Sequence, residues 1–212
     1  MSELKGQAQR GARSRQAIVD AALDVFAVRG FRASALAEIA ERIDMTPAGI
    51  LYHFGSKEEL LVAVIAERDR RAGGLLADLS RKVGLASLHE LERIAELCEA
   101  EPGLAALHTV LQTESFEPGA PAHDYFLGRS RFVREALEAF LVDAQEKGEV
   151  RPDVDCSARS REMIAFLEGA AVLWLLDRSV SLVDLYRTYI DTFIESVTGG
   201  AEVRGGGPST GG

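Results

Sequence analysis

The chain of 212 residues carries 24 Lys and Arg against 33 Asp and Glu, for a net charge of −9, and 47 % of its residues are apolar. This composition excludes a disordered chain and supplies enough apolar surface for one large or two small domains. No early segment joins a basic start to a long apolar run, and no uncharged apolar stretch reaches the roughly 20 residues that span a bilayer. We therefore expect a cytoplasmic protein without membrane contact.

The two cysteines favour neither a metal site nor a disulfide. Cys98 and Cys156 have no CxxC partner and no histidine at metal-ligand spacing. Reduced, structural thiols are the expectation, which agrees with a cytoplasmic location. We expect no metal and no cofactor.

Charge is unevenly distributed along the chain. Residues 1–57 hold 8 Lys and Arg against 6 Asp and Glu, whereas residues 58–212 hold 16 against 27. Residues 1–12 are predicted to be a flexible basic arm that lies near phosphate groups. On charge alone, a terminus that only increases solubility is an equally good interpretation. The Gly-rich residues 199–212 are predicted to be a disordered tail.

Helical periodicity begins at about residue 13. Apolar residues at i, i+4, i+7 and i+8 predict a helix over 13–29, and Gly30 is suited to end it in the left-handed conformation. These residues are Ile18, Ala22, Val25 and Phe26. Ser34 is predicted to cap a second helix, which turns Leu36, Ile39, Ala40 and Ile43 inward.

The next helices are short and closely spaced. Asp44 and Met45 form the predicted connection, and Thr46 caps a third helix with Pro47 at its first position. Ser56 caps a fourth helix, with a glutamate three residues later as in a capping box. Two short helices joined by a tight turn, with a longer helix on each side, predict a helix-turn-helix whose second helix lies in a major groove of DNA.

The outer side of the third helix is the predicted DNA contact. Ala48 and Gly49 allow close approach to base edges, and Tyr52 and His53 can donate to phosphate oxygens. Each residue also has an ordinary structural explanation, such as packing for His53, so the prediction rests on their clustering. The full predicted set is Ser34, Thr46, Pro47, Ala48, Gly49, Tyr52, His53 and Lys57.

The segment "AALDVFAVRGFRASALAEIAERIDMTPAGILYHFGSKEELL" resembles the DNA-binding domain of the TetR family of bacterial transcriptional regulators over residues 15–65. The resemblance implies that the eight residues above fall at DNA-contacting positions. Leu51 departs from the family, which often has Tyr there and uses its hydroxyl on a phosphate. Asp44 stands where Gly is common, but Asp tolerates left-handed geometry.

The second half of the chain has helical periodicity throughout, so we expect an all-α fold of about nine helices. Gly, Pro and Ser clusters separate the predicted segments. These segments are 56–79, 87–100, 102–113, 121–147, 157–177 and 182–197. The predicted domains are a DNA-binding domain over 13–57 and a ligand-binding and dimerisation domain over 58–198.

Residues 163–176, "MIAFLEGAAVLWLL", contain one charge, Glu168, and so predict a helix that is covered on every side. We predict that a second copy of the chain covers this helix: the helix and the last helix of each copy would together form a two-fold bundle. The alternative is a core helix that is buried within one subunit. Two recognition helices roughly 34 Å apart would then match a near-palindromic operator. The predicted dimer residues are Phe166, Ala170, Leu173, Tyr186, Tyr189 and Phe193.

The family resemblance also implies a small-molecule effector, of unknown identity, between the helices of the second domain. A mostly apolar cavity with a few polar groups is the expected site, and the acidic surplus favours a cationic or neutral lipophilic effector only slightly. Taken singly, residues of these types are more often ordinary core residues than ligand contacts. The candidates are His108, Gln112, Tyr125, Glu168 and Trp174.

The chain lacks GxSxG, HExxH, P-loop and GxGxxG motifs, and the neighbouring His123 and Asp124 cannot face each other on a helix. We therefore expect no enzyme activity. The predicted function is an effector-responsive repressor that binds double-stranded DNA as a homodimer. A ligand-dependent activator and an effector-free DNA-binding protein of the same fold are the alternatives.

Overall fold

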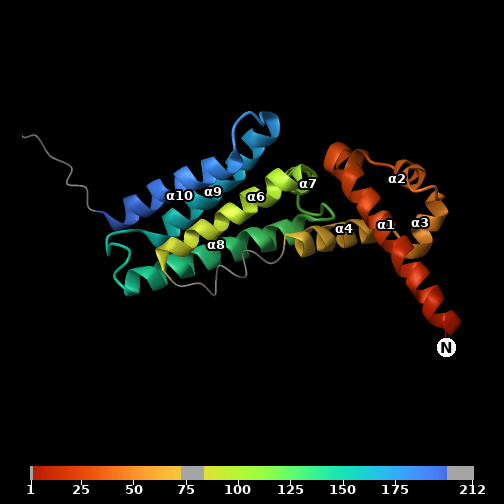
Figure 1. The fold of residues 1–212 in the computed structure, drawn as a ribbon, viewed down its shortest axis with the longest axis horizontal. Coiled ribbons are helices and arrows are strands. Elements are labelled where there is room, and N and C mark those ends of the chain that lie inside the picture. Colours follow the sequence, from red (N-terminus) through yellow and green to blue (C-terminus); the bar gives the residue numbers. More distant parts are fainter. Residues whose placement is uncertain (1, 73–83, 200–212) are drawn as a thin grey trace, which may run out of the picture.

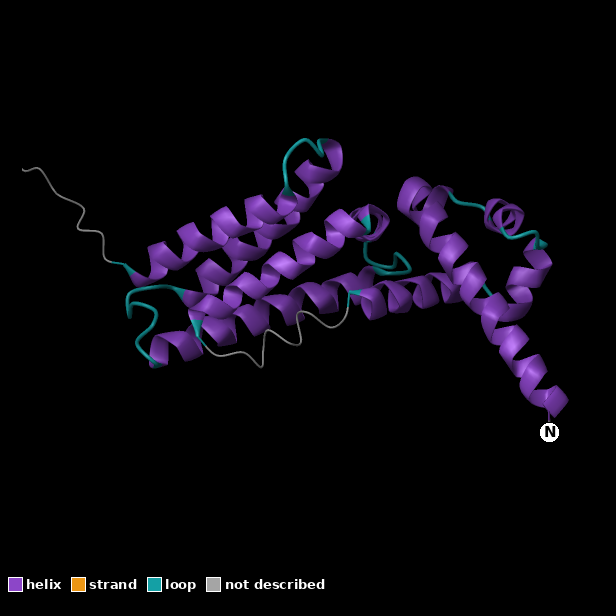
Figure 2. Cartoon of the chain, viewed as in Figure 1, coloured by secondary structure: helices purple, strands orange, loops and turns teal. Residues whose placement is uncertain are grey.

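The structure, a computed structural model, describes residues 2–72 and 84–199. Within these residues it contains nine α-helices, one 3-10 helix and no strand, which confirms the all-α prediction (Figures 1 and 2). Helices α1 to α3 form a small head at one end of an elongated molecule, and α6 to α10 form a bundle (Figure 1). Helix α4 joins the two.

Helix α1 spans Ser2–Ala33 and begins well before the expected residue 13. Residues 2–12, predicted as a flexible arm, are therefore helical; they contain no proline and are rich in strong helix formers, so the helix extends backwards from its packed part. Gly30, with φ 76° and ψ 171°, breaks the helical geometry near the far end. This confirms the left-handed break that its position predicts.

The helix-turn-helix consists of α2 (Leu36–Arg42) and α3 (Pro47–Phe54). Asp44 takes the left-handed conformation, with φ 51°, in the connection between them. The Thr46 hydroxyl accepts a hydrogen bond from the Gly49 N–H at 3.1 Å, so the predicted cap of α3 is confirmed. The turn and the cap together fix the angle at which α3 leaves α2.

The start of α2 differs from the prediction. Its N-cap position is Ala35, which has no side chain to accept a hydrogen bond, and the predicted cap, Ser34, is buried. The Ser34 hydroxyl instead donates to the Phe31 carbonyl at 2.8 Å. Ser34 therefore completes the end of α1, because the carbonyls of the last helical turn have no N–H partner within the helix.

Helix α4 spans Lys57–Arg71, and the Ser56 hydroxyl accepts from the Glu59 N–H at 3.0 Å. The Ser56 N–H donates to the Phe54 carbonyl at 2.8 Å, so only one half of the predicted capping box forms. The predicted helix extends to residue 79, and its part from residue 73 onwards lies outside the described residues. The predicted tail, from residue 200 onwards, also lies outside them.

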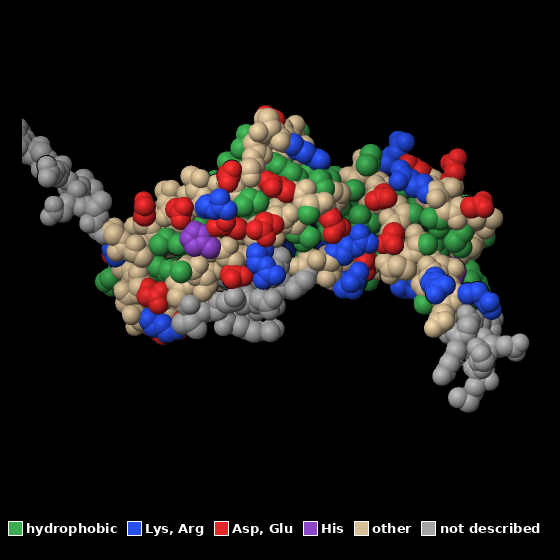
Figure 3. Space-filling view, viewed as in Figure 1, with side chains coloured by type: hydrophobic (Ala, Val, Ile, Leu, Met, Phe, Trp, Pro, Cys, Tyr) green, Lys and Arg blue, Asp and Glu red, His purple; other side chains and the backbone are tan. Residues whose placement is uncertain are grey.

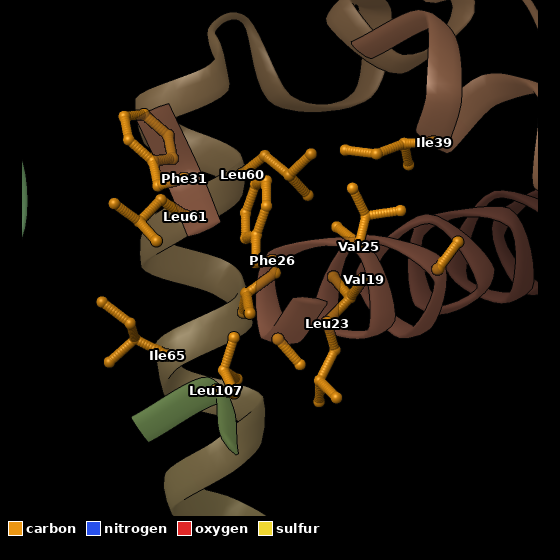
Figure 4. Close-up of a cluster of buried hydrophobic side chains, with 14 of the residues drawn as sticks. Val19, Leu23, Val25, Phe26, Phe31, Ile39, Leu60, Leu61, Ile65 and Leu107 are labelled. Carbon is orange, nitrogen blue, oxygen red and sulfur yellow. The ribbon is translucent and has the colours of Figure 1, made fainter. Parts of the chain in front are cut away.

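The core of the head contains side chains from beyond the predicted domain boundary at residue 57. Phe26 of α1 and Ile39 of α2 pack with Leu60 and Leu61 of α4 (Figure 4). Leu107, from helix α7 of the bundle, belongs to the same cluster. Head and bundle therefore share one continuous apolar core at their junction.

The bundle follows the predicted helices closely, except at its start. The 3-10 helix η1 occupies Leu85–Leu91, where a single α-helix over 87–100 was expected. The α-helices are α6 (Glu92–Ala100), α7 (Pro102–Glu114), α8 (His123–Glu146), α9 (Cys156–Leu176) and α10 (Leu182–Thr198). In the described part of the chain, no helix is long and apolar enough to cross a membrane.

Helix α9 is covered on one side only within the chain. Met163, Ala170 and Trp174 are buried against the bundle, whereas Leu173 and Leu176 are 67 % and 81 % exposed. Since the exposed positions of α9 from Ala165 onwards carry no charge, that part of the outer side is an apolar surface without a cover in the single chain.

Several predicted dimer residues are therefore core residues of one chain. Ala170, Tyr186 and Phe193 are at most 5 % exposed, and Phe166 stacks on Tyr189 with ring centroids 3.8 Å apart. Of the predicted set, Leu173 alone is largely exposed. The reason is that α10 turns its apolar stripe onto α9 and α6 of the same chain, which its sequence periodicity alone does not reveal.

Candidate nucleic-acid interface and ligand cavity

Helix α3 is anchored by two buried residues and presents its other side to solvent. Ile50 and Phe54 are at most 3 % exposed, whereas Tyr52 is 88 % exposed. An exposed tyrosine of this kind has no packing role, and its ring stands edge-on to that of His53 at 5.5 Å. Both side chains can donate to phosphate oxygens from this position.

The first turn of α3 has little side-chain bulk. Thr46, Pro47 and Ala48 are exposed, and Gly49 is partly so. A Cβ atom at Gly49 would lie 3.2 Å from Met45 Cε and 3.4 Å from Thr46 Oγ1. The glycine thus has a packing reason of its own, besides the close approach to DNA that it permits.

Lys57 does not point away from the protein as the predicted DNA contact would. Its Nζ donates to the Phe31 carbonyl at 2.5 Å and to the Ser34 carbonyl at 2.6 Å, and it lies over the Phe31 ring. Burial lowers the pKa of Lys57 from its ordinary value. In the structure, Lys57 and the buried Ser34 join α4 to the end of α1.

Cations line the exposed part of α1 instead. Arg10, Arg13 and Arg15 are exposed, and the Arg15 guanidinium lies 4.4 Å from the centroid of the Phe54 ring on α3. On the face shown in Figure 3, blue side chains flank the start of the chain, while red ones are spread over the bundle. An exposed cation beside α3, with further exposed arginines on α1, suits the polyanionic backbone of DNA.

A cavity of about 310 Å³ lies among α4, α6, α7, α8, α9 and α10. Its lining is mainly apolar, with side chains such as Leu97, Leu104, Val133 and Leu167. This volume is at the lower end for sites that bind small organic molecules. The cavity reaches the last turn of α4, where Arg68 and Asp69 form part of the wall.

Charged groups gather on that part of the wall. Asp69 accepts hydrogen bonds from Arg68 Nη1 at 3.0 Å and from the Tyr125 hydroxyl at 2.7 Å. Arg129 Nη1 of α8 lies 4.0 Å from the same Asp69 oxygen that Arg68 uses. Burial lowers the pKa of Arg129, and the charge of Arg68 adds to this effect.

His108 and Glu168 form a second polar pair in the cavity. His108 Nε2 lies 3.4 Å from Glu168 Oε2, and the buried His108 Nδ1 has no hydrogen-bond partner among the described residues. Burial is the largest cause of the lowered pKa of His108. A neutral His108 with its proton on Nε2, directed at the carboxylate, fits both facts.

The predicted ligand residues divide into three groups. His108 and Glu168 line the cavity, and Tyr125 touches its wall through Asp69. Trp174 is 5 % exposed in the bundle core, and neither Trp174 nor Gln112 lines the cavity. Trp174 is thus a packing residue because α9 directs it towards the interior of the bundle.

Sequence reasoning missed Arg68, Asp69 and Arg129. The sequence did indicate that Arg129 faces inward. Arg129 follows the apolar Phe126 by three residues and precedes Val133 by four, so it lies on the inner stripe of α8. Arg68 and Asp69 carried none, because the end of an amphipathic helix is ordinarily charged.

The cysteines are free in the structure, and burial raises the pKa of the Cys98 thiol to about 11. Such a thiol is a weak nucleophile at neutral pH. Within residues 2–72 and 84–199, no three His, Cys, Asp or Glu side chains are grouped as a metal site requires.

A capped tight turn, a short exposed recognition helix and exposed arginines on the preceding helix define a helix-turn-helix DNA-binding protein. Residues 18–64 match the family model described as bacterial regulatory proteins, tetR family. This match and the regulators that the chain resembles together indicate a transcriptional regulator of the TetR family.

Similarity to known regulators extends beyond the head. The chain is 25 % identical over 156 residues to the HTH-type transcriptional regulator UidR of Escherichia coli (strain K12), covering 74 % of this chain and 79 % of that protein. Transcriptional regulators of this kind are not an enzyme class.

Solved structures share the fold at low sequence identity. The regulator FadR from Bacillus subtilis, in complex with stearoyl-CoA, has a TM-score of 0.71 at 17 % identity over 86 % of this chain and 98 % of that one. The ketosteroid regulator KstR2 of Mycobacterium tuberculosis has a TM-score of 0.71 at 18 % identity, over 88 % and 95 %.

Proposed function

We propose that this regulator is a homodimeric repressor that binds a near-palindromic operator and is released when a small lipophilic molecule fills the cavity. The observation that carries the proposal is the double role of α4. Its first turns supply Leu60, Leu61 and Val64 to the core of the head, and its last turn supplies Arg68 and Asp69 to the cavity wall.

A helix of 15 residues is about 22 Å long and behaves as a nearly rigid rod. A ligand that pushes the end of α4 outward therefore moves the head at its other end. In a dimer, such a movement changes the separation of the two α3 helices and their fit to successive major grooves. FadR with its bound stearoyl-CoA supports the idea that this fold accommodates a lipophilic ligand.

The exposed side of α9 is the proposed dimer surface. Leu173 and Leu176 stand on it with the exposed Val172, and the small Gly169 lies on the same side. Small residues permit two such helices to approach closely, and a two-fold axis would pair the surface with itself. We further propose that the contacts to DNA come from Thr46, Pro47, Ala48, Gly49, Tyr52 and His53.

Selection of duplexes from a random pool tests the DNA-binding part of this proposal. We expect the protein to enrich an inverted repeat whose half-site centres are about 34 Å, or one helical turn, apart. Tyr52→Ala should weaken binding to the enriched duplex by about two- to tenfold per half-site, through the loss of a phosphate hydrogen bond, without loss of stability. Recovery of no preferred sequence would refute an operator-binding role.

The effector response is tested on the enriched duplex. Lipophilic extracts that lower the affinity support the repressor, whereas extracts that raise it support the ligand-dependent activator. An affinity that no extract changes supports an effector-free DNA-binding protein.

A further inference from the structure

The charged wall of the cavity indicates the chemical class of the effector, an inference that rests on the proposed function. The available space, about 310 Å³, is at the lower end of the range for sites that bind small organic molecules. Leu97, Leu104, Val133, Ile164 and Leu167 would surround most of such a molecule with apolar surface. The ligand is therefore compact and largely apolar.

Arg129 is the arginine of this wall that lacks a hydrogen-bond partner, whereas Arg68 donates to Asp69. Its side chain is 28 % exposed, and it donates no hydrogen bond to any residue within 2–72 and 84–199. Its nearest carboxylate atom, Asp69 Oδ1, is 4.0 Å away and already accepts from Arg68. A guanidinium has five donors, and leaving them unpaired in a largely apolar cavity is unfavourable.

The two carboxylates of the wall, in contrast, have partners. Asp69 holds Arg68 and Tyr125, and Glu168 faces His108. A cationic ligand would therefore have to share carboxylates that already have partners, and it would lie beside Arg68 and Arg129. An anionic ligand would find free donors on Arg129.

The electrostatics of the cavity wall also favour a negatively charged ligand. Burial acts to raise the pKa of Glu168, yet the hydrogen bond and charge of His108 and the charges of Arg129 and Arg68 lower it overall. For Arg129, burial and the neighbouring Arg68 lower the pKa despite Asp69 and Glu168. The Glu168 shift means that the surrounding groups stabilise negative charge here, whereas burial, the largest cause of the Arg129 shift, opposes charge of either sign.

We propose that the effector is a compact apolar carboxylate whose head group accepts hydrogen bonds from Arg129. Arginine and carboxylate form paired, charge-assisted hydrogen bonds, so the head is held at a fixed orientation with the apolar body among α6, α7 and α9. A carboxylate in this position competes with Asp69 of α4 for Arg129. Binding thus weakens a link between α4 and α8 at the point where α4 meets the bundle.

Calorimetric titration of the full chain without DNA tests this assignment. The probes are decanoate, a carboxylate of about the right size, and decanol and decylamine as its uncharged and cationic counterparts. We expect decanoate to bind at least about tenfold more tightly than either, as a charge-assisted hydrogen bond in a partly buried site would give. Equal or tighter binding of decanol or decylamine, or no binding of any probe, would overturn the assignment.

Two matched variants locate the effect. Arg129→Gln should reduce decanoate binding to the level of decanol, whereas Arg131→Gln, two residues along α8 and exposed, should leave it unchanged. A decanoate preference that survives in Arg129→Gln also overturns the proposal. Circular dichroism shows whether Arg129→Gln folds; if it does not, the comparison of the three probes on the natural chain decides.

The test separates this inference from the proposed function because it is measured without DNA. Tight, Arg129-dependent binding of decanoate with no change in operator affinity would refute release by a ligand and leave the carboxylate site standing. Operator binding and release by other compounds, without decanoate binding, would refute the carboxylate site alone.

Discussion

Glu114, at the end of α7, lies so close to Gly30 that a Cβ atom at Gly30 would stand 2.2 Å from Glu114 Oε1. The same carboxylate accepts hydrogen bonds from the backbone N–H of Phe31 at 2.6 Å and of Arg32 at 3.3 Å. The break in α1 thus exposes backbone donors, and the bundle supplies their acceptor. This contact is a second connection between the cavity-lining α7 and the DNA-reading head, independent of α4.

Replacement of Gly30 by alanine should destabilise the protein through both the left-handed backbone and the clash with Glu114. The backbone alone, at φ 76° and ψ 171°, costs a residue with a Cβ atom about 1–3 kcal/mol. Because Glu114→Ala removes the clash, Gly30→Ala should cost less in that background, and the double variant should be more stable than the sum of the single effects predicts. Urea unfolding of the four proteins measures this, and simple additivity would show that the two residues do not interact.

Lys57→Met distinguishes the structural role of Lys57 from the predicted contact with phosphate. The loss of two hydrogen bonds from a charged donor should lower the free energy of unfolding by about 2–4 kcal/mol. If its bonds to the Phe31 and Ser34 carbonyls are its main role, the salt dependence of DNA binding by the folded variant should be unchanged. A salt slope smaller by about 1 per site, with normal stability, would instead place Lys57 on a phosphate.

Leu173→Arg should separate the proposed dimer without unfolding the chain, since Leu173 is 67 % exposed in the single chain. A charge there would be buried without a partner in the dimer. Light scattering after gel filtration should show monomers with normal helix content and weakened operator binding.

Trp174→Ala provides the contrasting variant on the same helix. Trp174 is 5 % exposed, so its loss should cost about 3–5 kcal/mol of stability through a cavity in the core. A Leu173→Arg protein that remains a dimer would exclude this side of α9 as the interface.

Glu67 should make the protein sensitive to acid. Hydrogen bonds from Arg70, with help from Arg71 and against the effect of burial, lower the pKa of Glu67 from 4.5 to about 2. Because the folded-state pKa is below the ordinary one, the stabilisation is fully present above pH 4.5 and is lost as the pH falls towards 2.

Thermal unfolding between pH 6 and pH 2 checks this expectation. Glu67→Gln should be less stable than the natural chain at pH 6, and the difference should shrink as the pH falls. Glu117→Gln, at an exposed loop position, is the control and should follow the natural chain throughout. A constant difference between Glu67→Gln and the natural chain would show that the Glu67 charge is not responsible.

The local features of the head were predictable from the sequence because they depend on neighbouring residues. Caps at Thr46 and Ser56, the left-handed Gly30 and Asp44, and the buried side of α3 all follow from side-chain and backbone preferences over a few positions. The same rules failed where a second acceptor nearby competes. Ser34 was predicted as a cap because serine favours that position, but its hydroxyl donates instead to the Phe31 carbonyl, which lies in the last turn of α1 and has no partner within the helix.

The sequence by itself determined an all-helical chain, the helix-turn-helix and its family. Only the tertiary structure decided which apolar side of α9 and α10 is internal, and which charges meet in the cavity. The physical reason is that periodicity identifies an apolar stripe but not the surface it packs against. Arg68, Asp69, Arg129 and Glu168 come from three helices, so their proximity, and with it the electrostatic character of the cavity, follows only from how those helices pack.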